Sequence, residues 1–191
     1  MMHNKLMIQA DYFKVDIDLE YNDNAKMKYH FGDSCEINFH ASAMGIDPIS
    51  AMLESIKMLE YFGAFKYVLH GYLHGKMRFD ARIQSDTLEI VIEVHNSDDG
   101  ETDIRRWFVA IPYNRYKKGV VDAALTTLRM YGVNGFSKNC GIIGGTYFIG
   151  NLISILTDED CIRVDKEDDE RFYHSNIESE LGVLLKHLKQ S

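Results

Sequence analysis

Two histidines spaced four residues apart, His70 and His74, are the first candidate for metal chemistry. Side chains at this spacing point the same way on a helix or a strand, so they can provide two corners of a zinc site. The HExxH motif of zinc proteases needs Glu after the first His, but here that residue is Gly71, and no third ligand follows nearby. The spacing therefore predicts ordinary histidines at a bend, and we expect no bound metal or other cofactor.

Asp16, His30 and Glu36 are the second candidate, because the alternation of apolar and polar residues places all three on one face of a predicted sheet. A histidine flanked by carboxylates resembles part of an acid–base catalyst. The same row is also typical of a solvated sheet face with paired charges.

Neither candidate is accompanied by a recognisable nucleophile motif. The sequence has no GxSxG or CxxC motif, and its glycine-rich stretch at 141–150 matches no phosphate-binding loop. We therefore expect a protein that is not an enzyme, while an active site assembled from distant residues stays open.

The acidic residues are more distinctive than any catalytic motif. The chain has 29 Asp and Glu against 21 Lys and Arg, a formal net charge of −8, which disfavours nucleic acid as a ligand. Acidic residues are concentrated in the loop 98–103 and in the run 158–170. These segments either form a solvated surface or steer a basic protein partner towards the chain. Their spacing does not match the calcium-binding loop of an EF-hand. The nearby Trp107 is either an interface anchor or a core residue. The candidate partner-binding residues are Asp98, Asp99, Glu101, Asp103, Trp107, Asp158, Glu159 and Asp160.

The N-terminal segment and the cysteines indicate a cytoplasmic protein. The sequence MMHNKLMIQADYF lacks the apolar core of a signal peptide. Cys35, Cys140 and Cys161 fit free thiols better than disulfides. The uncharged stretch 140–156 is shorter than the ~20 residues that span a bilayer, so we expect a buried hairpin or helix there and no membrane segment.

Apolar residues at every second position predict three strands in the first third of the chain. They occupy the odd positions in 13–21, 27–31 and 35–39, whereas mostly polar residues occupy the even ones. Three-residue loops at 22–24 and 32–34 then connect the strands. The cross-strand pairs in this register include Tyr21–Ala25, Phe31–Cys35, Glu20–Lys26, Asp18–Lys28, Asp16–His30 and His30–Glu36.

A helix is predicted from Pro48, after the capping residue Asp47, to the glycine at position 63. Further strands alternate in 77–83 and 88–94 around a two-residue turn, followed by a strand at 104–111. After a basic loop that contains residues 115–119, the next helix is expected at about 120–131. The cross-strand pairs of the second hairpin are Ile83–Leu88, Arg82–Glu89 and Arg78–Glu93.

The predicted fold is a single α+β domain spanning 1–191, with antiparallel β-meanders packed on one face by amphipathic helices. The order βββα occurs twice, in 12–63 and 76–132, which is compatible with a pseudo-repeat. The remaining segment, 133–191, ends in a helix. That helix is expected to carry Phe172, Ile177, Leu181, Leu184, Leu185 and Leu188 on one side.

The acidic charge and the missing motifs favour a non-catalytic protein-binding protein, such as an immunity or inhibitor protein that neutralises a basic toxin or nuclease. One alternative is a small hydrolase or metal-dependent enzyme that uses His70 and His74, or His30 with nearby carboxylates. A further alternative is a secretion chaperone.

Overall fold

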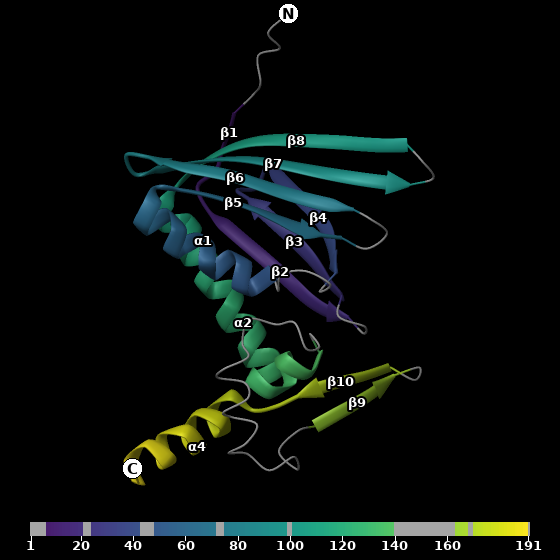
Figure 1. The fold of residues 1–191 in the computed structure, drawn as a ribbon, viewed down its shortest axis with the longest axis vertical. Helices are drawn as coiled ribbons and strands as arrows, with labels where there is room; N and C mark the ends of the chain where they lie inside the picture. The colour runs from purple at the N-terminus through teal and green to yellow at the C-terminus, as the bar shows by residue number, and fades with distance from the viewer. Residues whose placement is uncertain are drawn as a thin grey trace, which may run out of the picture.

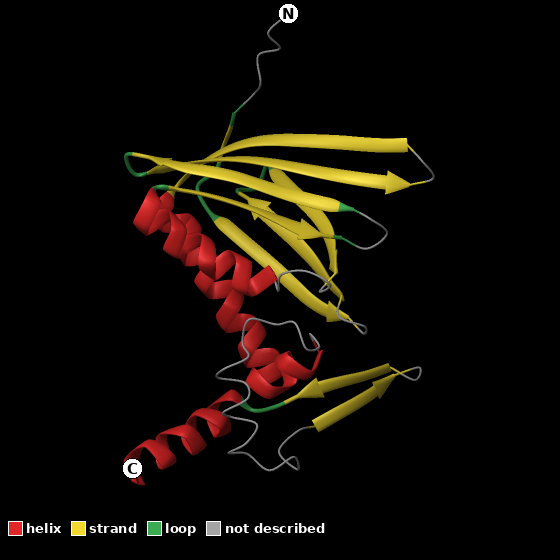
Figure 2. Ribbon diagram, in the orientation of Figure 1, coloured by secondary structure: helices red, strands yellow, loops and turns green. Residues whose placement is uncertain are grey.

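The computed structural model describes residues 7–20, 24–42, 48–71, 75–98, 101–139, 163–167 and 170–190 of the chain. They form the predicted α+β fold, with antiparallel meanders and a C-terminal helix. Figure 1 shows a larger sheet lying over a smaller one, with the helices along one side and at the lower end. Figure 2 shows the same separation of helices from strands.

The smaller sheet is built from strands with one apolar and one polar face. β2 (Phe13–Glu20), β3 (Asn24–Phe31) and β4 (Cys35–Ser42) pair antiparallel in the order β2-β3-β4. Their odd-numbered residues are almost all buried, as the period of two predicts. The turn at 32–34 and the pairing of Phe31 with Cys35 are confirmed.

The predicted register between β2 and β3 is wrong by two residues, and Asn24 belongs to β3 rather than to the preceding loop. A shift by two keeps every side chain on its face, so the apolar pattern alone does not distinguish the two registers. The observed register brings Phe13 and Phe31 together, with ring centroids 4.8 Å apart. The observed pairs include Phe13–Phe31, Lys14–His30, Asp16–Lys28, Asp18–Lys26 and Glu20–Asn24.

The larger sheet has the order β1-β8-β7-β6-β5 and is antiparallel except for the parallel pairing of β1 with β8. The predicted register of the β6–β7 hairpin is confirmed: Ile83 lies opposite Leu88, and the pairs Arg82–Glu89 and Arg78–Glu93 follow. The strands of this sheet are β1 (Ile8–Gln9), β5 (Ala64–His70), β6 (Lys76–Gln84), β7 (Thr87–Asp98) and β8 (Glu101–Pro112).

β5 is absent from the sequence prediction, which interprets the histidine-containing segment as a bend. Phe65, Tyr67 and Leu69 alternate with more exposed residues and face the core side of the sheet. The second unit therefore has four strands before its helix instead of three. An antiparallel bridge between Ala41 and Gly71 joins β4 to the end of β5, so the two sheets also meet edge to edge.

Helix α1 (Pro48–Phe62) ends before Gly63, as predicted. Helix α2 (Tyr113–Asn139) begins earlier than the predicted start near Val120, so the segment 115–119 is helical and the predicted basic loop is wrong. Tyr116 and Val120 are both almost completely buried and lie one helical turn apart. This apolar spacing favours a helix although basic residues surround it.

The C-terminal part comprises β9 (Arg163–Glu167), β10 (Glu170–His174) and α4 (Ile177–Gln190). β9 and β10 form an antiparallel hairpin, so part of the acidic run is a strand. Phe172 lies in β10 and not in the C-terminal helix, which corrects the sequence prediction. The glycine-rich stretch 140–156 lies outside the described residues.

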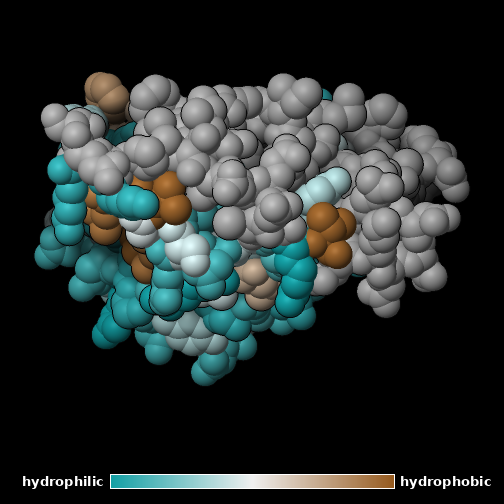
Figure 3. Space-filling view, turned by 90° about the horizontal axis from the view of Figure 1, so that it is seen from below, coloured by the Kyte–Doolittle hydropathy of each residue, from teal (hydrophilic) through white to brown (hydrophobic). Residues whose placement is uncertain are grey.

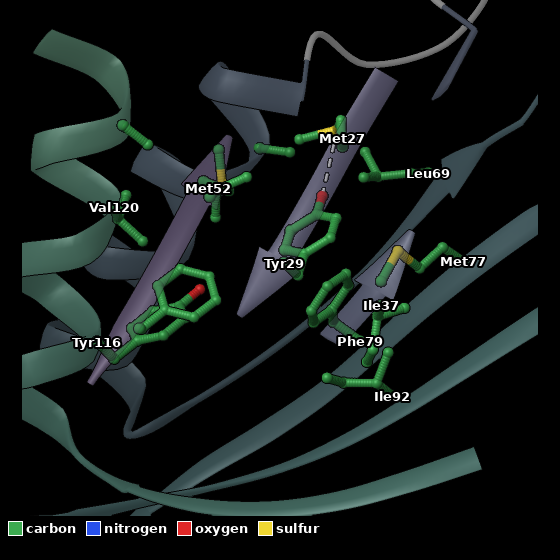
Figure 4. Packing of buried hydrophobic residues seen from close by; sticks show 14 of the residues in the cluster. Met27, Tyr29, Ile37, Met52, Leu69, Met77, Phe79, Ile92, Tyr116 and Val120 are labelled. Atoms are coloured by element: carbon green, nitrogen blue, oxygen red, sulfur yellow. Dashed lines mark hydrogen bonds between the residues drawn. The ribbon is translucent and has the colours of Figure 1, made fainter. Parts of the chain in front are cut away.

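One hydrophobic core joins the two sheets and the first two helices. The rings of Tyr29 in β3 and Phe79 in β6 meet between the sheets, with centroids 5.5 Å apart. Figure 4 shows this packing, and also Tyr116 and Val120 of α2 beside Met52 of α1 at one side. The helices therefore close the side of the core that the two sheets leave open.

Helix α2 approaches β2 too closely for any side chain at Gly119. A Cβ atom added at Gly119 would overlap the backbone carbonyl of Phe13 and lie 2.9 Å from its Cδ1. This glycine therefore allows the helix to lie directly on the strand, and the Phe13 ring packs 4.9 Å from the Tyr116 ring one turn away.

A kink at Gly132 connects α2 to the C-terminal part. Gly132 has φ 70° and ψ −178°, so the helix is interrupted there and the next backbone N–H groups have no partner inside it. The carboxylate of Glu180 in α4 accepts these N–H groups, from Val133 at 2.8 Å and from Asn134 at 2.9 Å. Glu180 is 2% exposed, so a buried acid caps the restarted helix.

We predict that Gly119→Ala lowers the free energy of unfolding by about 2–3 kcal/mol, because the added methyl group forces α2 away from β2. Chemical denaturation measures this change. Lys118→Ala is the matched control, since Lys118 is exposed on the same helix and its substitution should change stability by less than about 0.5 kcal/mol. Equal stability of the two variants would contradict the close approach.

Candidate functional site

The outer face of β2-β3-β4 carries the predicted histidine–carboxylate group. His30 lies on the central strand; its Nε2 is 3.1 Å from Asp16 Oδ2 on β2 and its Nδ1 is 3.8 Å from Glu36 Oε2 on β4. Glu36 is directly opposite His30, as predicted, whereas Asp16 reaches it diagonally because Lys14 occupies the opposite position. The three residues thus come together in spite of the incorrect register.

A second histidine–carboxylate contact lies on the same face and is absent from the sequence prediction. Nε2 of His40 on β4 is 2.5 Å from Oε2 of Glu20 on β2, and Lys26 on the strand between them also pairs with Glu20. The sequence indicates only that all three residues occupy even positions and therefore share the polar face of the sheet. The contact crosses two strands, so it follows only from the observed register and the curvature of the sheet.

The two groups border an open hollow of about 540 Å³ over the middle of the sheet. Two cross-strand rows of polar residues line it, Asp16–Lys28–Asn38 and Asp18–Lys26–His40, together with the residues between these rows. The lining residues are Asp16, Ile17, Asp18, Lys26, Met27, Lys28, Asn38, Phe39 and His40.

The ion pairs on this face stabilise ionised carboxylates. Partial burial of Asp16 opposes ionisation, but the nearby Lys14 and His30 outweigh it and lower the pKa of Asp16. The pKa of Glu20 is lowered in the same way, with burial outweighed by Lys26 and His40.

Both ring nitrogens of His30 face carboxylates. A general base that activates a nucleophile needs one nitrogen directed at the hydroxyl or thiol to be deprotonated. The geometry at His30 is therefore that of an ion-pair network on a sheet face.

Only one of the two candidate metal ligands, His70, lies among the described residues. His70 is exposed at the end of β5, opposite Lys76, and His74 lies outside the described residues. Among the residues that the structure describes, no group of three or more His, Cys, Asp or Glu side chains is arranged to hold a metal ion.

The first acidic segment forms the end of the β7–β8 hairpin. Pairing of β7 with β6 stops at His95, but pairing with β8 continues through Asn96–Asp103 to Asp98–Glu101. Three further residue pairs extend the hairpin by about 10 Å beyond β6. Figure 1 shows β7 and β8 reaching past the neighbouring strands.

Near this end of the hairpin, Asp103 pairs with Arg105 at 2.8 Å, and Ile104 is 52% exposed. Trp107 lies further along β8, opposite Ile92, and is packed partly buried against the core. Of the two roles considered for Trp107, interface anchor or core residue, this position fits the core residue. The predicted residues Asp99, Asp158, Glu159 and Asp160 lie outside the described residues.

A groove of about 770 Å³ between α1 and β5 is a feature that the sequence prediction misses. Leu53 and Met58 of α1 line it together with Phe65 and Tyr67 of β5, whose rings stack 5.4 Å apart. The alternation in 64–70 is the signal for β5, but the approach of a helix to the edge strand is a tertiary feature with no local pattern.

Comparison with known proteins identifies no relative. No protein-family model matches the chain, and neither a curated protein nor a solved structure shows significant similarity. No helix among the described residues is long and apolar enough to cross a membrane.

We predict that the outer face of β2-β3-β4 makes the fold sensitive to acid. The folded chain keeps Asp16 and Glu20 ionised to lower pH than the unfolded chain, so the unfolded chain binds more protons as pH falls below about 4. Their contribution to stability is therefore present at neutral pH and is lost in this acidic range.

Asp16→Asn combined with Glu20→Gln should lower the thermal midpoint at pH 7 and flatten its decline between about pH 5 and 2. The matched control is Asp18→Asn, because Asp18 occupies the same face of β2 but forms no ion pair with the described residues. An acid-induced decline that is identical in all three proteins would contradict the assignment.

Proposed function

We propose that this chain is a non-catalytic protein that binds a basic protein partner, in the manner of an immunity or inhibitor protein for a basic toxin or nuclease. The observation that carries the proposal is the extension of the β7–β8 hairpin, whose paired strands continue to Asp98 and Glu101 after the pairing of β7 with β6 has ended. An extended hairpin end can enter a cleft on a partner with little rearrangement of the core.

The arrangement of charge supports a role for this end of the molecule. On the outer sheet faces, acids pair with neighbouring cations, as in Arg82–Glu89 and Lys66–Asp80. The hairpin end has four acids within six residues, of which Asp103 pairs with Arg105. The segment 98–103 therefore concentrates negative charge that can accelerate encounter with a basic surface.

An exposed apolar residue beside the acids is a second, independent argument. Ile104 lies opposite His95 and keeps 52% of its surface exposed, although it belongs to a strand. Protein interfaces commonly combine a small apolar contact with a charged, solvated rim. Ile104 provides the contact and the segment 98–103 provides the rim.

We predict that neutralising the hairpin acids weakens binding without changing the fold. The variant carries Asp98→Asn, Asp99→Asn, Glu101→Gln and Asp103→Asn. The immobilised wild-type chain is used to capture proteins from a lysate of its native cell, and mass spectrometry compares the captured proteins with those that the variant retains. We expect a basic protein that only the wild type retains.

The control variant carries Asp11→Asn, Asp18→Asn, Glu54→Gln and Asp122→Asn, which remove the same charge from exposed positions outside the hairpin. With the captured protein purified, the hairpin variant should associate about ten-fold more slowly than the control at low salt, and the difference should shrink at high salt. Equal association rates at low salt for the two variants would contradict the proposal.

A further inference from the structure

Helix α4 has an apolar side that the rest of the described chain leaves uncovered. Its anchoring residue is the buried Glu180, which binds backbone N–H groups of α2. Leu181 and Leu185, one turn apart, are 46% and 54% exposed. Figure 1 shows α4 at the lower end of the molecule, and Figure 3 views this end, where hydrophobic surface lies beside hydrophilic surface.

The charged residues beside the two leucines are arranged for pairing with a reversed copy of the same helix. Glu178 at the start of α4 and Lys189 near its end are both exposed. At about 100° per residue, both lie on the same side of Leu181, within about 80° around the helix axis. A two-fold axis perpendicular to the helix places a second copy antiparallel to the first. The side that carries Glu178 and Lys189 then lies on the same side of the contact in both copies, so Glu178 of each copy faces Lys189 of the other.

The same symmetric arrangement brings a large side chain against a small one. Pairing Glu178 with Lys189 places Leu185 of one copy opposite Gly182 of the other. Gly182 is exposed, and a Cβ atom added there would meet nothing within 4 Å. The glycine therefore leaves space for the leucine of the opposite helix.

We propose that the chain forms a homodimer through antiparallel packing of two α4 helices. Leu181 and Leu185 form the apolar centre, and two Glu178–Lys189 ion pairs flank it. A contact between single 14-residue helices is small, so we expect a dissociation constant in the micromolar range. This inference is independent of the proposed function, because the hairpin end of β7–β8 lies at the other end of the molecule (Figure 1).

Sedimentation equilibrium of the full chain tests the dimer. From about 1 to 200 μM, which brackets the expected micromolar dissociation constant, the mass should rise from 22.0 kDa towards twice this value. Leu185→Glu should weaken the dimer at least about 100-fold, because it places a charge in the apolar centre. Leu125→Glu is the matched control, since Leu125 is 43% exposed on α2, and it should dimerise like the wild type.

Charge reversal tests the antiparallel direction. Glu178→Lys and Lys189→Glu should each weaken dimerisation by about ten-fold, and the double variant should restore it, because the pairs are re-formed with exchanged signs. Lys186→Glu makes the same charge change about 100° around the helix from Leu185 and about 140° from Leu181, and it should have a smaller effect.

Circular dichroism of each variant confirms that the fold is retained. A wild-type chain that stays monomeric at 200 μM would overturn the proposal and leave the leucines to a different partner. Dimerisation that survives Leu185→Glu would overturn it as well. A double variant that remains as weak as the single ones would overturn the antiparallel arrangement.

Discussion

The packing of two sheets on one shared core is the interaction on which the rest of the structure depends. The two sheets pack through the faces that carry most of their apolar side chains, and Tyr29 and Phe79 meet where these faces approach, with 0% and 1% exposure. The hydroxyl of Tyr29 donates a hydrogen bond to Sδ of Met27, a weak acceptor, and burial raises the Tyr29 pKa well above its usual value. The outer faces carry many ion pairs, so the shared core is where the two sheets bury most of their apolar surface.

Helix α2 connects the core to the C-terminal part of the chain, and two of its glycines have different roles in this connection. Gly119 allows direct contact with β2, whereas Gly132 interrupts the helix and exposes N–H groups that Glu180 binds. Ser175 strengthens the same joint, because its backbone N–H binds the carbonyl of Tyr131 and its Oγ accepts the N–H of Gly135. Among the described residues, these hydrogen bonds to backbone groups join the C-terminal part to α2, and Leu181 and Leu185 of α4 stay about half exposed.

Sequence periodicity predicts the faces of the strands reliably, but it does not by itself determine the register. The β6–β7 register is correct because a two-residue turn leaves little freedom. In β2 and β3, acids and lysines alternate, so Asp18 faces a lysine in either register, Lys28 as predicted or Lys26 as observed. Charge matching therefore does not distinguish the two. The contact between His40 and Glu20 and the groove beside β5 depend on three-dimensional packing, which no local pattern encodes.

The histidine–carboxylate pairs are better explained as a stabilising network than as a catalytic centre. A carboxylate that orients a catalytic histidine occupies one ring nitrogen and leaves the other for the substrate or nucleophile. Here Asp16 and Glu36 face opposite nitrogens of His30, so both nitrogens are directed at carboxylates of the neighbouring strands. Because these acids are paired with cations on the same sheet face, they contribute little to long-range attraction of a basic partner. The two protein contacts that we propose therefore use charged residues elsewhere in the chain, in the segment 98–103 and at the two ends of α4.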